Sequence, residues 1–353
     1  MITDLTVGHP KHTLWRFLLP MFISVMFQQL YNMVDSIVVG RFVGSTALAA
    51  VGTAFPVVFL LSSMFMGLGI GAMVMVSQFY GAGDAERLKA TIDTIYTALI
   101  VGIVPLSIVG ILVSRPIIAL LAVPADTADQ CWIYMVIVLG GLIGSLGYNA
   151  NSGILQGLGD SKTPLYFLCL SSALNVVLDL LFVVTFSMGV AGAAWATILS
   201  QGVSALLCLV YMLKKFPILR TGRADWAWHG PMVRRLARMG IPTALSNSVT
   251  AIGCMILQVT INGFGSTVVA AYTAASKVEQ LTTQPTFTFG LAAATFTAQN
   301  AGAGKLDRVK DGVRKATVLN LIAGLAAAVV VWLFAAPITT WFVDPGETAV
   351  IAA

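Results

Sequence analysis

Two aspartates, Asp35 and Asp179, lie inside long apolar stretches of this 353-residue sequence, as do Lys277 and Glu279. An ionisable side chain at the centre of a membrane costs about 2.5–3.5 kcal/mol on insertion scales, so each one needs a partner or a function. Lys277 and Glu279 are two residues apart and would point to different faces of a helix, where a structural ion pair and a substrate contact fit equally well. The aspartates are therefore the stronger candidates for chemistry.

Asp35 ends a polar stripe on an otherwise apolar segment. Gln28, Tyr31 or Asn32, and Asp35 follow i, i+3/i+4, i+7 spacing, which places them on one face of a helix. This face must meet a cavity or another helix, because lipid offers no hydrogen bonds. The stripe favours a carboxyl that binds and releases a proton as a cavity opens to each side. The alternative is a structural residue capped near the outer end of the helix.

Asp179 has Asn175 one helical turn before it, and Thr197 could add a hydroxyl from the next segment. Two carboxyls, an amide and a hydroxyl in a low-dielectric pocket would favour protonation near neutral pH. The same oxygens could instead hold Na⁺, a hard cation. The sequence does not show that Asp35 and Asp179 meet, and Asn175 with Asp179 could simply join two helices.

The amino-acid composition indicates that lipid, and not water, surrounds these apolar segments. The sequence is 58% hydrophobic and 10% charged, with a mean hydropathy of +0.88, whereas soluble domains carry roughly 25% charged residues. We therefore predict an all-α polytopic membrane protein, with Pro20 bending the first span. The nine predicted spans are 14–39, 50–79, 92–114, 130–156, 164–185, 190–213, 239–263, 268–299 and 315–334.

Lysines and arginines fall almost entirely on one side of these spans, with only Arg41 and Arg115 on the other. The positive-inside rule then places the N-terminus in the cytoplasm and explains the net charge of +5 without nucleic acid. The basic stretch 214–238 becomes a cytoplasmic linker. The four cysteines lie in or beside apolar runs without metal-ligand spacing, which predicts buried thiols.

Residues 78–89 (QFYGAGDAERLK) and 299–310 (QNAGAGKLDRVK) share their glutamine, Gly-Ala-Gly, arginine and lysine, and Pro20 has a counterpart in Pro242. Six spans separate the copies, so both enter the membrane in the same direction, as in transporters with parallel repeats. Asp35 aligns with an apolar residue in the second copy, which predicts that the first copy alone carries a coupling cation. We predict two six-helix lobes, twelve helices in all, of which about nine are present: a first lobe (1–213), the linker (214–238) and a truncated second lobe (239–353).

Two glycine-containing segments resemble phosphate loops but lack their features. Gly67, Gly69 and Gly71 lie within an apolar helix, where close helix packing explains them better than a nucleotide site. The segment GLGDSKTP (157–164) is predicted to be a tight inside turn. We expect no cofactor beyond a coupling ion, and no metal site beyond Na⁺.

The segments LPMFISVMFQQLYNMVDSIVVGRFVG, QFYGAGD, LQGLGDSKTP, LNVVLDLLFV and GAAWATILSQ resemble the multidrug and toxic compound extrusion (MATE) transporters, and most closely their prokaryotic DNA-damage-inducible F-like branch. The resemblance implies exchange of H⁺ or Na⁺ for amphipathic, often cationic, drugs. It also implies that Pro20 bends the first helix. By the same resemblance the cation site comprises Asp35, Asn175, Asp179 and Thr197, and the candidates for the substrate cavity are Gln28, Tyr31, Asn32 and Asn149.

Three alternatives remain open. A lipid-linked oligosaccharide flippase of the same superfamily should need a basic cavity, whereas the first-lobe spans are acidic. A membrane-embedded aspartyl enzyme would use the two carboxyls, but no further catalytic signature is present. A structural membrane protein would leave the acids unexplained. We therefore expect a monomeric, non-enzymatic exporter in the bacterial cytoplasmic membrane, with amphipathic small molecules and lipid as its partners.

Overall fold

The computed structural model describes residues 3–120, 123, 125–216, 230–262, 283 and 286–339, and all regular structure in these ranges is helical. Residues 286–302 form a helix that precedes α10. In chain order the other helices are α1 (Pro10–Val38), the π-helical turn η1 (Val39–Val43), α2 (Ser45–Gly81), α3 (Ala85–Leu120), α4 (Ala125–Gly140), α5 (Leu142–Gly157), α6 (Lys162–Asp179), the π-helical turn η2 (Leu180–Thr185), α7 (Gly189–Lys215), α8 (Gly230–Asn262) and α10 (Leu306–Thr339).

Length and composition allow several described helices to cross a membrane. Four single segments qualify, and two bent pairs qualify when each pair counts as one span. One bend of 47° separates Thr127–Gly140 from Leu142–Gly157. Large apolar side chains cover the outside of the bundle, as Leu112 and Trp332 show at 71% and 81% exposure. Such a surface needs lipid as its solvent.

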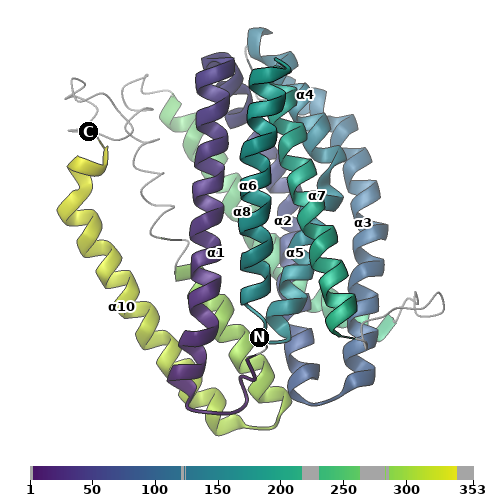
Figure 1. Cartoon of the computed structure of the whole chain (residues 1–353), viewed down its shortest axis with the longest axis vertical. Helices are drawn as coiled ribbons and strands as arrows, with labels where there is room; N and C mark the ends of the chain where they lie inside the picture. The colour runs from purple at the N-terminus through teal and green to yellow at the C-terminus, as the bar shows by residue number, and fades with distance from the viewer. Residues whose placement is uncertain are drawn as a thin grey trace.

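The helices run along the long axis of the molecule and reverse direction at each turn (Figure 1). At the lower end of Figure 1, α1 begins, α2 turns into α3, and α10 begins. We call this the inner end, because the sequence assigns its turns to the cytoplasm. Helix α1 packs on α6, α2 packs on α3, α4 and α5, and α7 packs on α4, α5 and α6.

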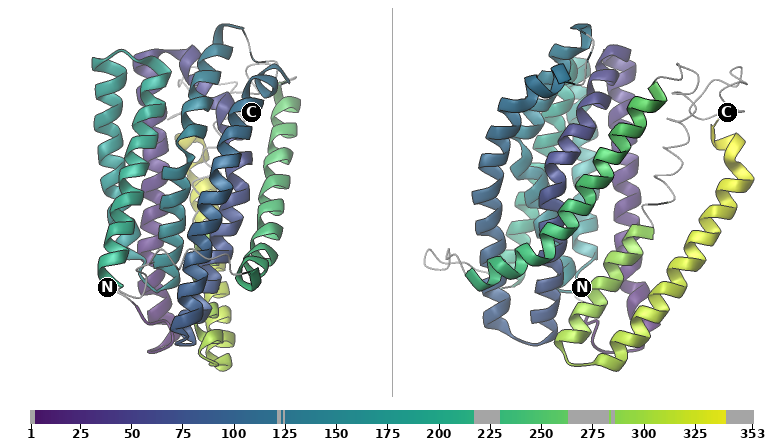
Figure 2. Two further views of the ribbon diagram at one scale, coloured as in Figure 1. Left: turned by 90° about the vertical axis from the view of Figure 1, so that its right-hand side faces the viewer. Right: turned by 180° about the vertical axis from the view of Figure 1, so that it is seen from behind.

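Helix α8 lies obliquely across this bundle and packs along α2 (Figure 2). The contact is close because glycines face backbone: a Cβ built on Gly67 would stand 2.5 Å from the amide nitrogen of Ala244, and one on Gly71 would stand 3.3 Å from that of Gly240. The prediction that these glycines serve helix packing is confirmed for Gly67 and Gly71. Gly69 faces open space.

Helix α10 contacts α1 and diverges from the bundle toward its C-terminal end (Figures 1 and 2). Between them, residues of 286–302 complete a core at the inner end. Phe17 and Leu18 of α1 pack there with Phe289 and Phe296. The start of α1 is therefore held by elements of the second sequence copy.

The predicted spans match the described helices as far as α7. Helix α8 begins at Gly230, which is inside the predicted linker 214–238. Residues 217–229 of that linker lie outside the described residues. Of the predicted span 268–299, residues 283 and 286–299 are described and helical, so Lys277 and Glu279 lie outside the description.

Candidate functional site

Asp35 and Asp179 lie side by side in the interior between α1 and α6. Asp35 is 9% exposed and Asp179 is fully buried. Their carboxyl groups are close enough to interact directly with each other. The structure therefore brings together the two acids whose proximity the sequence left open.

These carboxyls have an unusual environment, because most of their oxygens have no hydrogen-bond donor among the described residues. One oxygen of Asp35, both oxygens of Asp179 and both polar atoms of Asn175 find no hydrogen-bond partner among the described residues. A buried polar atom without a partner loses about 1–3 kcal/mol of solvation, so native proteins rarely keep several together. Two facing carboxylates also repel each other. A proton shared between them, or a small cation, would relieve both penalties.

The backbone around the acids departs from regular α-helix. Asp179 is the last residue of α6 and η2 follows it directly, while η1 begins one turn after Asp35. The two π-helical turns pack together through Val39 and Val183. π-Helical turns are rare and are frequent at functional sites. Hydrophobicity and spacing in the sequence carried no signal for them.

Four aromatic and polar side chains lie around the acid pair. Tyr31 lies beside Asp35 and beside the side chains of Thr197 and Gln201, without completing a hydrogen bond from its own hydroxyl. Tyr134 of α4 lies close to Asp35 and Asp179 as well. Thr197 was predicted for this cluster from the sequence, whereas Tyr134 and Gln201 were not, because their positions depend on how α4 and α7 pack.

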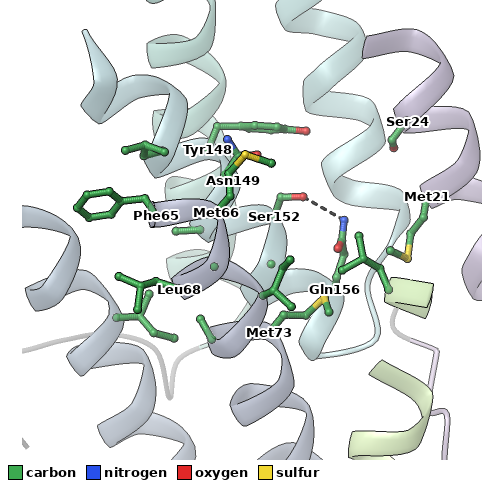
Figure 3. A pocket seen from close by; sticks show the side chains of 18 of the residues that line it. Met21, Ser24, Phe65, Met66, Leu68, Met73, Tyr148, Asn149, Ser152 and Gln156 are labelled. Atoms are coloured by element: carbon green, nitrogen blue, oxygen red, sulfur yellow. Dashed lines mark hydrogen bonds between the residues drawn. The ribbon is translucent and has the colours of Figure 1, made fainter. Parts of the chain in front are cut away.

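A cavity of about 200 Å³ lies between α1, α2 and α5 (Figure 3). Its walls are mostly apolar and include Met66 and Met73, with Asn149, Ser152 and Gln156 as polar groups. Among the described residues that line it, none is ionisable except Tyr148. Flexible methionines with a few neutral polar groups suit ligands of varied shape.

A second, smaller pocket extends from the lining of this cavity to Tyr31. Gln28, Tyr148 and Asn149 line both spaces, and Tyr31 and Gln201 line only the smaller one. Tyr31 in turn lies beside Asp35. The polar stripe of α1 therefore runs from the cavity to the acids.

Two other predicted residues lie elsewhere on α1. The Asn32 side chain is exposed, donates to Oε1 of Gln29 (3.4 Å) and lines neither space. Pro20 lies within α1, which continues on both sides of it, and the hydroxyl of Ser24 donates to its carbonyl oxygen (2.9 Å). Among the described residues, no cluster of three or more His, Cys, Asp or Glu could hold a metal ion.

A helical membrane bundle with a buried acid pair, linked by polar residues to an apolar cavity between helices, has the form of a secondary transporter. Comparison with known proteins identifies the family. The family model MatE matches residues 20–181 and 242–353, two segments that begin at the repeated prolines. The chain belongs to the MATE family of multidrug transporters, multi-pass membrane proteins that are not enzymes.

Relatives named as transport or drug-resistance proteins match most of the chain. The probable multidrug resistance protein YoeA of Bacillus subtilis is 31% identical over 97% of this chain and 76% of its own length. A FAD transporter of Shewanella oneidensis is 25% identical over 93% of this chain and 73% of its own.

Solved structures have the same fold. An outward-facing multidrug resistance MATE transporter of the MOP superfamily matches with a TM-score of 0.89 and 27% identity, over 99% of this chain and 78% of that one. A MOP superfamily transporter from Pyrococcus furiosus matches with a TM-score of 0.88 and 28% identity, over 99% and 77%. The described helices are therefore arranged as in MATE transporters.

Proposed function

We propose that this protein is a cation-coupled antiporter of the DNA-damage-inducible F-like branch, which exports amphipathic, often cationic, drugs or toxic metabolites in exchange for H⁺ or Na⁺. The observation that carries the proposal is the buried Asp35–Asp179 pair, which lies behind Tyr31 at the end of a polar path from the cavity. Three of its four carboxyl oxygens have no donor among the described residues. The protein lies in the bacterial cytoplasmic membrane with its N-terminus inside.

The coupling follows from competition for the acid pair. With the pair charged, a cationic substrate in the cavity is attracted through Tyr31 and Gln28. Binding of H⁺ or Na⁺ to Asp35 and Asp179 removes that attraction and weakens substrate binding. Exchange requires only that the cation prefer one orientation of the transporter and the substrate the other.

The cavity lining also separates this proposal from lipid-linked oligosaccharide flipping. A pyrophosphate head group calls for arginine or lysine in the cavity. None of the described residues that line either pocket is basic. The neutral, methionine-containing walls fit an amphipathic organic molecule better.

The test uses the protein in proteoliposomes with pH and Na⁺ gradients imposed separately, and ethidium as substrate. One of the two gradients alone should drive ethidium movement, and Asp35→Asn should abolish it. Asp129→Asn is the matched control, because Asp129 is an exposed carboxylate of α4. Full gradient-driven transport by the Asp35 variant, or movement of a lipid-linked oligosaccharide instead of ethidium, would overturn the proposal.

A further inference from the structure

The N-terminal strap, residues 3–8, crosses the inner end of the molecule between the two sequence copies. On the first copy, the amide of Thr3 donates to the carbonyl oxygen of Gly159 in the α5–α6 turn (2.9 Å). On the second copy, the amide of Leu5 donates to Oε1 of Gln299 (3.3 Å). Leu5 is fully buried in the core formed with Phe296. The strap is therefore an ordered bridge and not a loose end.

Gln299 joins the strap to both copies. Its side chain accepts from Leu5 and donates from Nε2 to the carbonyl oxygen of Gly157, at the end of α5 (2.7 Å). Gln299 is fully buried. Separation of the inner ends must break the bond between Gln299 and Gly157, and the strap must then detach from one of the two copies.

Two cations hold the strap on the second copy. Arg308 donates to the carbonyl oxygens of Leu5 (3.2 Å), Val7 (3.2 Å) and Gly8 (2.7 Å), and its Nε donates to Asn300 (2.9 Å). Lys305 donates to the carbonyl oxygen of Thr6 (2.8 Å). The carbonyls of residues 5–8 thus all accept hydrogen bonds from charged donors. Such charge-assisted bonds are stronger than those between neutral groups.

The equivalent residues of the first sequence copy bind no such strap among the described residues, and they serve as a comparison. By the 221-residue repeat, Arg308 corresponds to Arg87 and Lys305 corresponds to Asp84. Arg87 is 65% exposed and forms a local ion pair with Asp84 (3.4 Å). The acid-to-lysine change in the second copy removes the local partner of the arginine, and both cations turn to the strap instead.

We propose that the N-terminal strap is a cytoplasmic latch, positioned by Arg308 and Lys305, which holds the inner ends closed and must release before the cavity opens inward. The proposal rests on the transport cycle proposed above. It adds a control element at the inner end, far from the acid pair near η1 and η2. Arg308 acts here as a positioning residue and does not touch substrate.

The test measures the separation of the inner ends directly. Spin labels are placed at Ala85 and Leu306, exposed positions that correspond in the repeat and begin α3 and α10. The four native cysteines are replaced, and the full chain is kept in lipid. Arg308→Gln and Lys305→Asp should each raise the ratio of long to short distances about tenfold, equivalent to about 1.4 kcal/mol. Lys305→Asp recreates the local ion pair of the first copy and so withdraws Arg308 from the strap.

Arg87→Gln is the matched control, because it removes the equivalent arginine without touching the strap. It should leave the distance distribution unchanged. Equal distributions for Arg308→Gln, Lys305→Asp and Arg87→Gln would overturn the latch. The same distance comparison can be repeated in an Asp35→Asn background, because it does not require transport. Failure of the latch would then appear in the distances, whereas failure of the coupling site would appear only in ethidium transport.

Discussion

Gly81 of α2 lies directly against the backbone of Gln299, and its repeat counterpart Gly302 lies in the same way against Gln78. A Cβ on either glycine would collide with the carbonyl group of the facing glutamine. The two copies of the repeated turn therefore interlock reciprocally at the inner end. This contact explains why both copies keep glycine at the same place in the QxxG pattern.

Gly81→Ala should open the inner end. Alanine normally stabilises a helix relative to glycine by up to about 1 kcal/mol, but here the new Cβ forces the backbones apart at a cost of about 1–3 kcal/mol. Distances between labels at Ala85 and Leu306 should lengthen, and Gly302→Ala should have the same effect. Gly52→Ala is the control on the same helix, because nothing lies within 4 Å of a Cβ built there. Unchanged distances in both interlock variants would show that this contact does not close the inner end.

Asp35 and Asp179 should act as one unit in coupling. If a single cation bridges both carboxyls, Asp35→Asn and Asp179→Asn should each remove gradient-driven transport, and the double variant should be no worse than either alone. The measurement is ethidium transport in proteoliposomes at equal protein content. Independent, additive losses would instead mean that the acids serve separate steps.

Asn149→Leu should weaken substrate binding without changing coupling. Asn149 lines both the cavity and the pocket toward Tyr31, and its amide donates to the carbonyl oxygen of Ser145 (2.9 Å), leaving its own oxygen for a ligand. Loss of one polar contact costs about 0.5–1.5 kcal/mol, so the KM for ethidium should rise roughly two- to tenfold with kcat kept. Tyr166→Phe, at a 66% exposed position of α6, is the control. A lower kcat at constant KM would place Asn149 in the conformational cycle.

The sequence predicted both buried acids, though not that they meet, because an aspartate in an apolar helix is costly wherever it occurs. It also predicted the repeat and the close packing of Gly67. Three features escaped it because they arise only from three-dimensional packing. The π-helical turns after Asp35 and Asp179 follow from how α1 and α6 meet, and the position of Tyr134 follows from the packing of α4. The strap, residues 3–8, has no apolar periodicity, and its partners in the second copy lie about 300 residues away along the chain.

Asp160 was also missed as an individual residue, although its segment was correctly predicted to form a tight turn. Its side chain is fully buried at the inner end. It accepts hydrogen bonds from the amide of Thr163 (3.1 Å) and from the hydroxyl of Thr163 (2.8 Å) at the start of α6. It also pairs with Lys215 at the end of α7 (3.4 Å). One carboxylate thus caps a helix and ties it to its neighbour.

Asp160→Ala should therefore lower stability without altering the coupling site. The variant loses a helix cap, worth about 0.5–2 kcal/mol, and the ion pair with Lys215, which is 32% exposed and keeps its bond to the hydroxyl of Tyr211. A total loss of about 1–3 kcal/mol is therefore expected. Thermal unfolding of the purified protein in detergent should show a clear drop in Tm. Asp84→Ala is the matched control: it removes a cap on the amide of Arg87 (3.0 Å) and an exposed ion pair with the same residue, but no buried carboxylate. It should cost only about 0.5–2 kcal/mol and lower Tm less than Asp160→Ala. The protein that remains folded should still respond to the gradient that drives the wild type, because Asp160 lies at the opposite end of α6 from Asp179. Loss of gradient response at full stability would instead assign Asp160 to the transport cycle.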